Sequence, residues 1–571
     1  MPWDQVVLVE KAVDFFSEQI RVNPKDPFPF LMRASVAYDQ SELAKAGASP
    51  FLVPAGVEHV EIERDFIADY SKAIRLDPKL VAAYIGRGDA RTNRKEYDKA
   101  IADYSEAIRL DGQDAASYHR RADAWYGKMD YDNAVADYTE AIRLDRNDAK
   151  LYAGRAGTWR KKKQFDKAIA DYSEVIRLSP SSAEGYYRRG TTFRDAKNYG
   201  KAISDLDQAI RIAPDDSDGY IARGNVRADR NEFDKAIADY NEAIRLDPSD
   251  ALAYYNRGST WRDRNELDKS VADFTEAIRL GLQDANVFEG RGSVWSETGQ
   301  WDSAIADYTE AIRLDPREPL YYRARAYGWR SANDLDKALA DMGEAMRLEP
   351  EAPGDHCDRA FIWLLKKDYD KAISDFNDAI RLDPKNAWAH AYRGRTWMLK
   401  NDFAKAAIDF DAAVALDPKN TYYLFHRSVA LFLTRRPGAS NGFKTVLELE
   451  GWRGYSSLYA AIMGHFAARR DGHADQAKAL LDEAASRCDT SAWPYPVVNY
   501  LRGEIDEPKL MGAANDDDQR TEVRCFLGLK SLNENKKSAA LSHFLWVKEH
   551  GNPSLTQYAI SLIELDRLEG K

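Results

Sequence analysis

The sequence predicts an all-α solenoid, in which short helix pairs stack on one another in chain order. A ten-residue phrase, ADYSEAIRLD at 102–111, returns along the 571 residues in forms such as ADYTEAIRLD and ADYNEAIRLD. Its last aliphatic residue recurs every 34 residues without an insertion, at Leu76, Leu110, Leu144, Leu178, Ile212, Leu246, Leu280, Leu314, Leu348, Leu382 and Leu416. A strict period of this length is typical of helix–turn–helix units that bury a core only by stacking.

Each 34-residue unit, counted from residue 81, carries a framework that indicates two closely packed helices. Position 8 is always glycine or alanine, and position 20 is alanine in nearly every unit, as at Ala100 and Ala134. Positions 4, 11 and 24 are mostly aromatic, a spacing that favours buried helix–helix contacts over a cofactor site. A proline after many second helices, as at Pro78 and Pro248, ends the helix before the next unit.

This framework resembles the tetratricopeptide repeat across residues 81–420. The resemblance implies a right-handed superhelical solenoid whose inner groove is lined by positions 2, 5, 9, 12 and 13 of each first helix. It also implies that a carboxylate clamp would need Lys at position 5 and Asn at position 9. No unit has both residues, so a receptor for chaperone tails is not expected.

The pattern changes at both ends of the regular array. We expect an N-terminal helix at 1–26 that leaves the array open, as though a preceding domain were cut away. A first repeat at 27–80 follows, with an insertion near 41–60, and then come ten regular units at 81–420. Divergent helical repeats are expected at 421–520, and a final unit with a capping helix at 521–571. The insertion is either a lengthened helix with a surface loop or a binding loop.

The stretch from Ala492 to Phe544, which contains AWPYPVVNYLRGEI and RCFLGLKSLNENKKSAALSHF, resembles the C-terminal region of the bacterial lipoprotein called new lipoprotein I. The resemblance implies a dimeric repeat adaptor that brings cell-wall hydrolases to a protease, and hence a possible homodimer. The lipid-anchored cysteine of that family has no counterpart, because the first cysteine is Cys357. We expect a cytoplasmic protein, or an exported one if the chain lacks its original N-terminus.

Composition and motifs exclude several classes of function. A net charge of −11 disfavours nucleic acid, including single-stranded RNA, as the partner. No apolar run approaches the length of a membrane span. No phosphate loop, nucleophile elbow or metalloprotease motif occurs, so we expect no catalytic residue and no cofactor. His543 and His550 share a helix face without a carboxylate or cysteine at ligand spacing, so we expect no metal site. His356 and His390 stand at position 4, where tyrosine is usual, and we expect both to be core residues.

Two charged positions are constant through the ten regular units. Position 7 is always arginine, from Arg87 to Arg393, and position 23 is always aspartate, from Asp103 to Asp409. Both adjoin the small residues that bring the two helices together, which predicts a ladder of ion pairs buried between helices. The alternative, an arginine ladder that binds an anionic polymer, is less favoured because a buried guanidinium needs a carboxylate.

The groove positions vary from unit to unit while the framework is constant, as a binding surface requires. Arginine and tyrosine are common in protein contact surfaces. The candidate groove residues are His119, Tyr126, Arg160, Tyr187, Arg194, Tyr255, Arg262, Arg323 and Arg330. Asp195, Asp229, Asp263 and Glu297 alternate with them, and this mixture of signs favours an extended polar peptide.

The groove becomes apolar toward the C-terminus. The candidate residues of this apolar groove are Phe361, Leu364, Leu365, Met398, Leu399, Phe432 and Leu433. Because a monomer seldom exposes such a strip, we expect residues 357–433 to be covered. The covering element is expected to be the chain's own C-terminal helices, and otherwise a second copy or a partner's amphipathic helix. Ordinary core between irregular units is the remaining interpretation.

These observations predict a non-catalytic scaffold or adaptor that binds a partner protein or an extended peptide in its concave groove. The alternative is an accessory, substrate-recruiting region of a larger enzyme whose catalytic domain lies outside this chain. Affinity capture that compares the wild type with a groove variant would show whether the groove binds a partner.

Overall fold

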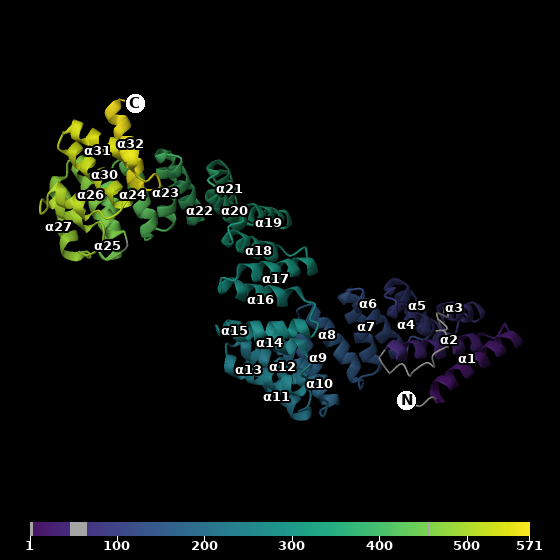
Figure 1. Ribbon diagram of the computed structural model, residues 1–571. Helices are drawn as coiled ribbons and strands as arrows, with labels where there is room; N and C mark the ends of the chain where they lie inside the picture. The colour runs from purple at the N-terminus through teal and green to yellow at the C-terminus, as the bar shows by residue number, and fades with distance from the viewer. Residues whose placement is uncertain (1–3, 46–65, 455, 571) are drawn as a thin grey trace. The chain divides into compact units, whose positions relative to one another are not determined.

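The computed structural model describes residues 4–45, 66–454 and 456–570 (Figure 1). Every regular element in these ranges is an α-helix, and within each of two compact units successive helices pack on one another, so the predicted all-α solenoid is confirmed. Contacts divide the chain into two compact units, Met1–Leu282 and Gln283–Lys571, which are described separately. The insertion predicted near 41–60 lies outside the described residues, except that helix α2 continues to Lys45.

The first unit contains fifteen helices among its described residues. They are α1 Asp4–Val22, α2 Pro27–Lys45, α3 Phe66–Leu76, α4 Val81–Asn93, α5 Tyr97–Leu110, α6 Ala115–Gly127, α7 Tyr131–Leu144, α8 Ala149–Lys161, α9 Phe165–Leu178, α10 Ala183–Asp195, α11 Tyr199–Ile212, α12 Ser217–Asp229, α13 Phe233–Leu246, α14 Ala251–Asp263 and α15 Leu267–Arg279. From α4 onward, the even-numbered helices are the first helices of the repeats and the odd-numbered ones are the second helices.

The second unit continues the same alternation and then departs from it. Its helices are α16 Ala285–Glu297, α17 Trp301–Leu314, α18 Pro319–Ser331, α19 Leu335–Leu348, α20 Pro353–Leu365, α21 Tyr369–Leu382, α22 Ala387–Leu399, α23 Phe403–Leu416, α24 Thr421–Leu433, α25 Ala439–Glu450, α26 Ser457–Arg470, α27 Ala474–Arg487, α28 Tyr495–Arg502, α29 Glu507–Ala513, α30 Asp517–Asn533, α31 Lys537–His550 and α32 Thr556–Glu569. The short helices α28 and α29 interrupt the pairing.

The turn between the two helices of a pair is set by one residue in the left-handed conformation. Lys163 has φ 57°, Asn231 has φ 58° and Gly299 has φ 73°, each two residues after its helix ends. Such a residue lets the last carbonyls of the first helix accept hydrogen bonds from the turn. At the start of many first helices an aspartate accepts from the first-turn amides, as Asp114 does from Ala116 and Ser117.

The two helices of a pair touch at the small residue of position 8 and the ring of position 24. A Cβ atom added to Gly88 would lie 2.6 Å from the ring of Tyr104, and one added to Gly224 would lie 2.6 Å from the ring of Tyr240. Both tyrosines are almost fully buried. The sequence pattern of small and aromatic residues therefore marks the contact between paired helices.

The C-terminal part of the second unit has one continuous core. Buried apolar residues from Ala391 to Leu565 form a single cluster, and Phe466 stacks on Phe526 with ring centroids 6.1 Å apart. Helix α26 packs on α30, and α30 packs on α32, so segments distant in sequence come together. This part is closer to a globular domain than to a linear array.

Candidate protein-binding groove

The predicted ion-pair ladder is present in all ten regular units, and the prediction is confirmed. In each unit the arginine of position 7 on the first helix pairs with the aspartate of position 23 on the second, with closest N–O distances of 2.6 to 2.7 Å. The pairs are Arg87–Asp103, Arg121–Asp137, Arg155–Asp171, Arg189–Asp205, Arg223–Asp239, Arg257–Asp273, Arg291–Asp307, Arg325–Asp341, Arg359–Asp375 and Arg393–Asp409. The aspartate side chains are at most 10% exposed. Arg33 and Asp69 form the same pair ahead of the regular units.

Most ladder arginines make a second contact that sequence reasoning missed. Nη1 donates to a polar side chain at position 25 of the preceding repeat, sixteen residues earlier. The acceptors are Ser71, Ser105, Thr139, Ser173, Asp207, Asn241, Thr309 and Asn377. Each such arginine thus joins three helices from two consecutive repeats. The hydrogen bond to Asp205 is the chief reason that the pKa of Arg189 is raised.

The ladder arginines are consequently occupied by the fold. Arg121 also lies 5.7 Å from the ring centroid of Tyr118 at position 4. Arg359 differs, because the residue sixteen positions earlier is Gly343, and its side chain is 30% exposed. The alternative of an arginine ladder that binds an anionic polymer is not supported, since Nε and Nη2 of these arginines already donate to the aspartate of their own unit, as in Arg121 and Arg359.

Two of the predicted groove arginines are paired across repeats. Nε of Arg160 donates to Asp195 at 2.6 Å, and Nε of Arg194 donates to Asp229 at 2.7 Å. Each arginine belongs to position 12 of one repeat and each acid to position 13 of the next. These side chains are about one third exposed, so such pairs contribute little to stability and remain open to exchange with a ligand.

The other predicted groove residues of the first unit lie in separate small contacts. The rings of Tyr126 and Tyr131 meet edge to face, and the ring of Tyr255 is tilted against Phe274. Nε2 of His119 lies 3.5 Å from Asp123. Arg188 lies over the ring of Tyr187, and burial raises the pKa of that tyrosine. Arg262 lies 4.0 Å from Asp263.

The predicted groove arginines of the second unit also have partners. Arg323 donates to Asp355 at 2.6 Å and pairs with Glu349, and these hydrogen bonds raise its pKa, with that to Asp355 contributing most. Arg330 lies over the rings of Tyr327 and Phe361, with centroid distances of 4.7 and 5.4 Å. A guanidinium between two rings is a common element of protein interfaces.

A hollow of about 330 Å³ opens in the first unit where α8 presents small residues. Ala153, Gly154 and Gly157 form its base on the side of α8. The other lining residues, which come from α6, α7, α9 and α10, are Asp123, Tyr126, Tyr138, Tyr172, Val175, Glu184, Gly185 and Arg188. Several of these occupy predicted groove positions. Burial raises the pKa of Tyr172, so its hydroxyl stays protonated.

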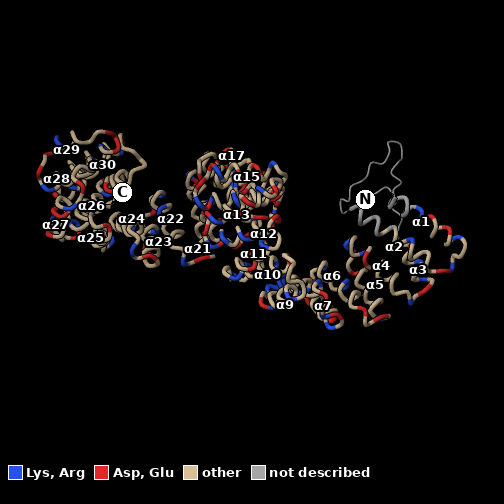
Figure 2. Tube along the Cα trace, turned by 90° about the horizontal axis from the view of Figure 1, so that it is seen from below, with Lys and Arg blue, Asp and Glu red and all other residues tan. Residues whose placement is uncertain are grey.

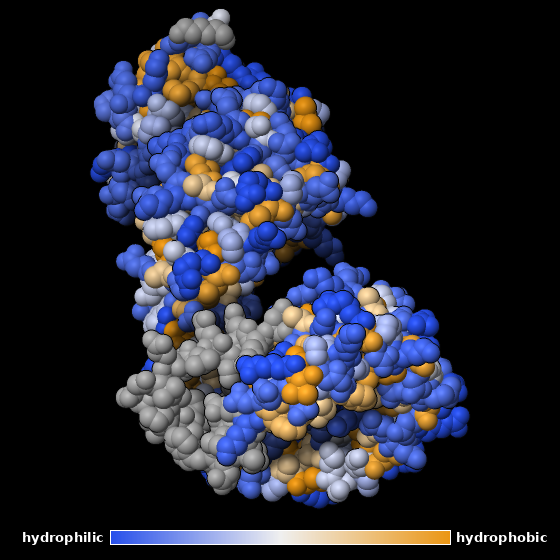
Figure 3. Space-filling model, turned by 90° about the vertical axis from the view of Figure 1, so that its right-hand side faces the viewer, coloured by the Kyte–Doolittle hydropathy of each residue, from blue (hydrophilic) through white to orange (hydrophobic). Residues whose placement is uncertain are grey.

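Charge is mixed over the described surface. Figure 2 shows Lys and Arg alternating with Asp and Glu along the helices of both units. On the face in Figure 3, hydrophobic surface forms separate patches within a mostly hydrophilic surface. This distribution suits a polar polypeptide as a ligand.

Comparison with protein-family models identifies the repeat. A model described as "TPR repeat" matches residues 159–193 and 224–261, and models described as "Tetratricopeptide repeat" match 67–115, 115–148, 183–216, 296–356 and 366–421. Together these ranges cover about half of the chain. The chain belongs to the tetratricopeptide repeat family. No matched range extends past residue 421, and the resemblance of the C-terminal region to the lipoprotein family stays a prediction.

Solved structures with this fold match at low identity. A tetratricopeptide repeat protein from Parabacteroides merdae is 17% identical, covers 43% of this chain and 98% of its own, and has a TM-score of 0.39. Yeast Tom70 is 19% identical, covers 69% and 97%, and has a TM-score of 0.32. YrrB, described as a TPR protein with an unusual peptide-binding site, is 23% identical, covers 32% and 95%, and has a TM-score of 0.30. No curated protein matches the chain.

The tetratricopeptide helices are too short or too polar to span a bilayer, and the same holds for every other helix in the described ranges.

The apolar groove of the second unit is covered only at its end. Phe432 and Leu433 are 3% and 2% exposed, because α26 and α32 lie against this segment. Arg470 places its guanidinium 4.6 Å from the Phe432 ring centroid and donates to the Phe432 carbonyl at 2.6 Å, and Arg567 donates to the Leu433 carbonyl. Coverage by the chain's own helices is confirmed here.

Coverage by the chain's own C-terminal helices is wrong for the part of the apolar groove nearer the N-terminus. Leu365 and Leu399 are 49% and 48% exposed. The neighbouring candidates are half-buried in the packing between repeats. Phe361 meets the Tyr392 ring edge to face, and Leu364 packs together with Trp363. Met398 packs against the C-terminal core. The C-terminal helices close on α24 and do not extend to α20 and α22. Coverage of Leu365 and Leu399 by a second copy or a partner stays a prediction.

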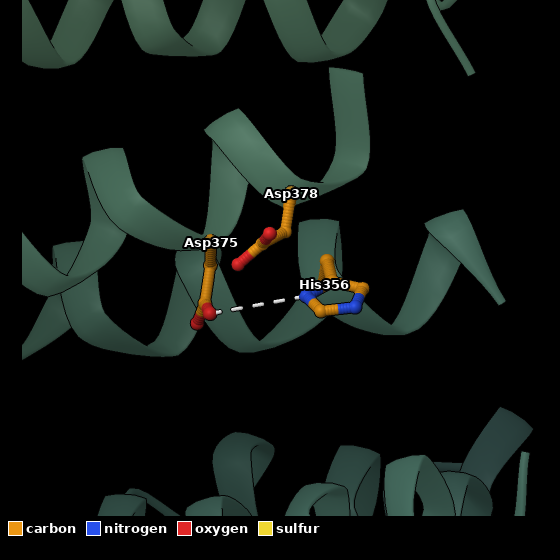
Figure 4. Close-up of side chains that lie close together, drawn as sticks. All are labelled: His356, Asp375 and Asp378. Atoms are coloured by element: carbon orange, nitrogen blue, oxygen red, sulfur yellow. Dashed lines mark ion pairs between the residues drawn. The ribbon is translucent and has the colours of Figure 1, made fainter. Parts of the chain in front are cut away.

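One group in the second unit has the residue types of a metal site. Ligand atoms of His356, Asp375 and Asp378 lie within 4.8 Å of one another (Figure 4). Both oxygens of Asp375 already accept from Arg359, at 2.8 and 2.6 Å, and Asp378 pairs with Arg381. A cation here would compete with two guanidinium groups. The prediction that His356 and His390 are core residues fits their burial, since their side chains are 11% and 13% exposed.

Proposed function

We propose that the chain is a non-catalytic scaffold that binds an extended peptide, or an extended segment of a partner protein, along the first helices of its tetratricopeptide repeats. One observation carries the proposal: the same Arg–Asp pair holds every regular unit, while the side chains at groove positions differ in each. A constant support with a variable face provides a row of distinct contacts, as recognition of a specific sequence requires.

The chemistry of that face favours a polypeptide of mixed charge. Arg160 and Arg194 hold their acids through partly exposed pairs, which a ligand carboxylate can replace. Tyrosine rings beside these pairs offer apolar contact together with a hydroxyl. An anionic polymer would meet Asp195 and Asp229 in the same surface and would be repelled.

A peptide selection tests the proposal. Purified protein is used to select from a displayed library of random twelve-residue peptides, and the affinities of enriched peptides are then measured. The groove variant carries Arg194→Glu and Arg262→Glu. The matched control carries Arg109→Glu and Arg245→Glu, with the same change of charge on exposed positions of second helices.

We expect enriched peptides to bind the groove variant at least tenfold more weakly and the control variant unchanged. Equal affinity for both variants, or no enrichment of any sequence, would contradict the proposal. Blank assays for hydrolase and transferase activity are also expected, whereas a turnover abolished by one polar substitution would oppose it.

A further inference from the structure

A three-residue module joins α4, α5 and α6 in the first unit, and the repeats that follow keep only parts of it. Asp89 at position 9 accepts from the hydroxyl of Tyr104 at 2.8 Å. It also accepts from Nε of Arg120, at position 6 of the next repeat, at 3.0 Å. Burial raises the pKa of Asp89, and the Arg120 guanidinium opposes that shift. An acid, a tyrosine and an arginine thus satisfy one another on the groove side.

The next module, one repeat later, lacks its arginine. Asp123 is the acid, and it accepts from the hydroxyl of Tyr138. The residue at the place of Arg120 is Gly154. Among the described residues no lysine or arginine pairs with Asp123, whose side chain is 52% exposed; its other neighbour is Nε2 of His119 at 3.5 Å. This carboxylate faces the hollow without a fixed cation.

The module after that lacks its acid. Gly157 stands at position 9, so Tyr172 has no side-chain acceptor there. Tyr172 is 4% exposed, and its hydroxyl makes no hydrogen bond among the described residues. The arginine of this module, Arg188, pairs instead with Glu184 of its own helix at 2.5 Å. Tyr240, in a later repeat, keeps its partner, Asn225, at 2.8 Å.

Packing does not require glycine at position 157. A Cβ atom added to Gly157 would meet only the Tyr172 hydroxyl oxygen, at 3.9 Å, which is an ordinary contact. The Tyr172 hydroxyl is not one of the fully buried polar atoms that lack a partner, so it opens on the hollow, where a ligand can accept from it. Gly157 therefore leaves this donor open toward the hollow, and helix packing does not require the glycine.

The hollow thus has a carboxylate without a fixed cation at one end, and at the other a free tyrosine donor beside an arginine that is paired only within its own helix. Asp123 forms the acidic end, and Tyr172 with Arg188 forms the donor end. Gly154 and Gly157 are three residues apart on α8, and such positions are about 5–6 Å apart on a helix surface. In an extended peptide, residues two apart lie on the same side at about 6–7 Å. The spacing of a basic and an acidic side chain in such a peptide is close to that of the two side chains missing from α8, the arginine at position 154 and the acid at position 157.

We propose that this hollow binds a peptide segment with a basic and an acidic side chain two residues apart, the basic one on Asp123 and the acidic one on Tyr172 and Arg188. The inference rests on the proposed function, because it names the sequence that the groove reads at α8. The ligand completes both interrupted modules, and the Tyr126 and Tyr138 rings line the space around the basic side chain. Exchange of Glu184 for the ligand on Arg188 costs little, since both side chains are about half exposed.

The test uses the full chain and four fluorescent peptides based on acetyl-Gly-Arg-Ala-Glu-Gly. In the second peptide citrulline replaces arginine, in the third glutamine replaces glutamate, and the fourth has both replacements. The protein variants are Asp123→Asn, which removes the acidic end, and Gly157→Asp, which supplies the missing acid to Tyr172 and Arg188. The matched controls are Asp215→Asn and Gly200→Asp, at exposed positions away from the hollow.

We expect the wild type and both controls to prefer the first peptide over the citrulline and glutamine peptides by about tenfold each, a free-energy difference of about 1.4 kcal/mol. Asp123→Asn should abolish only the preference for arginine, and Gly157→Asp only the preference for glutamate. Circular dichroism checks that the variants are folded.

Equal binding of the four peptides by the wild type, or preferences that persist in both variants, would overturn the inference. The outcome is separable from that of the proposed function. A library selection that yields groove-dependent peptides without this pair of charges keeps the function and removes the inference. A selection that yields nothing, together with specific binding of the first peptide, would limit recognition to the hollow.

Discussion

The regular repeats and the C-terminal segment from α24 to α32 are held together in different ways. In the repeats, buried apolar residues form small clusters, such as the four-residue cluster that includes Tyr104, and hydrogen bonds from the ladder arginines connect one repeat with the next, as from Arg121 to Ser105. In the C-terminal segment one apolar cluster runs through many helices and ends at Leu565. The comparison shows that buried polar contacts can hold neighbouring repeats together where no single apolar core runs through them.

The largest effect is expected from a cavity in the C-terminal core. Phe526→Ala should lower the free energy of unfolding of this segment by about 3–5 kcal/mol, because Phe526 is fully buried and stacks on Phe466. Hydrogen exchange measured by mass spectrometry should show faster exchange in α26 and α30 and unchanged exchange in α4 to α11. Faster exchange throughout the first unit as well would show that the two regions share one core.

Replacing a ladder arginine by alanine should have the second-largest effect on stability, and the size of the loss should depend on the neighbouring arginines. Arg121→Ala leaves Asp137 without a guanidinium partner, and we expect a local loss of about 3 kcal/mol. Arg223→Ala should cost about 1 kcal/mol less, because Arg227 still donates to Asp239 at 2.7 Å. Local opening free energies from hydrogen exchange of α7 and α13 measure both. Identical losses would mean that Arg227 gives no support, and no loss would mean that water solvates the ladder.

A pH effect is expected in the C-terminal segment. Burial, with a smaller contribution from Arg395, lowers the pKa of His426 to about 4. The unfolded chain therefore takes up a proton at higher pH than the folded chain, so stability falls as the pH drops from about 6.5 toward 4. The loss is about 3 kcal/mol at the lower end. His426→Phe, which can keep the stacking on Phe410, should remove this dependence in denaturant titrations at pH 7 and pH 4.5. A variant with the same slope would assign it to other groups.

The smallest effect is expected from the exposed charges of the second helices. Arg109 pairs with Glu106 on the same helix face in solvent, and its side chain is 65% exposed. Arg109→Ala should leave the unfolding temperature unchanged within error, because water replaces such pairs readily. A clear decrease would indicate that these pairs also connect the repeats.

The 34-residue period made the fold and the Arg–Asp ladder predictable, because each framework residue returns at the same place with the same neighbours. The contacts of Arg121 with Ser105 and of Arg160 with Asp195 were harder to predict, since they join different repeats and depend on how consecutive pairs stack. The exposure of Leu365 was predicted wrongly, because sequence does not show how far the C-terminal helices extend.

The hollow at α8 has a signal in the sequence that lies partly outside the groove positions 2, 5, 9, 12 and 13. At position 6 the repeat of α8 has Gly154, while the next repeat has Arg188. The signal becomes readable only when positions 6, 9 and 24 are compared across neighbouring repeats, a relation that the structure supplies through Tyr104, Asp89 and Arg120.

The arginine that contacts two repeats has a genetic consequence. Every regular unit except the one with Gly343 has a polar residue at position 25 before the unit that follows, and each brings its own aspartate for its arginine, as Ser105, Arg121 and Asp137 show. Removing or duplicating one whole 34-residue unit therefore rejoins an arginine with an equivalent acceptor wherever position 25 is polar. Unequal recombination between the repeated coding segments can therefore lengthen or shorten this array while every ladder charge keeps a partner.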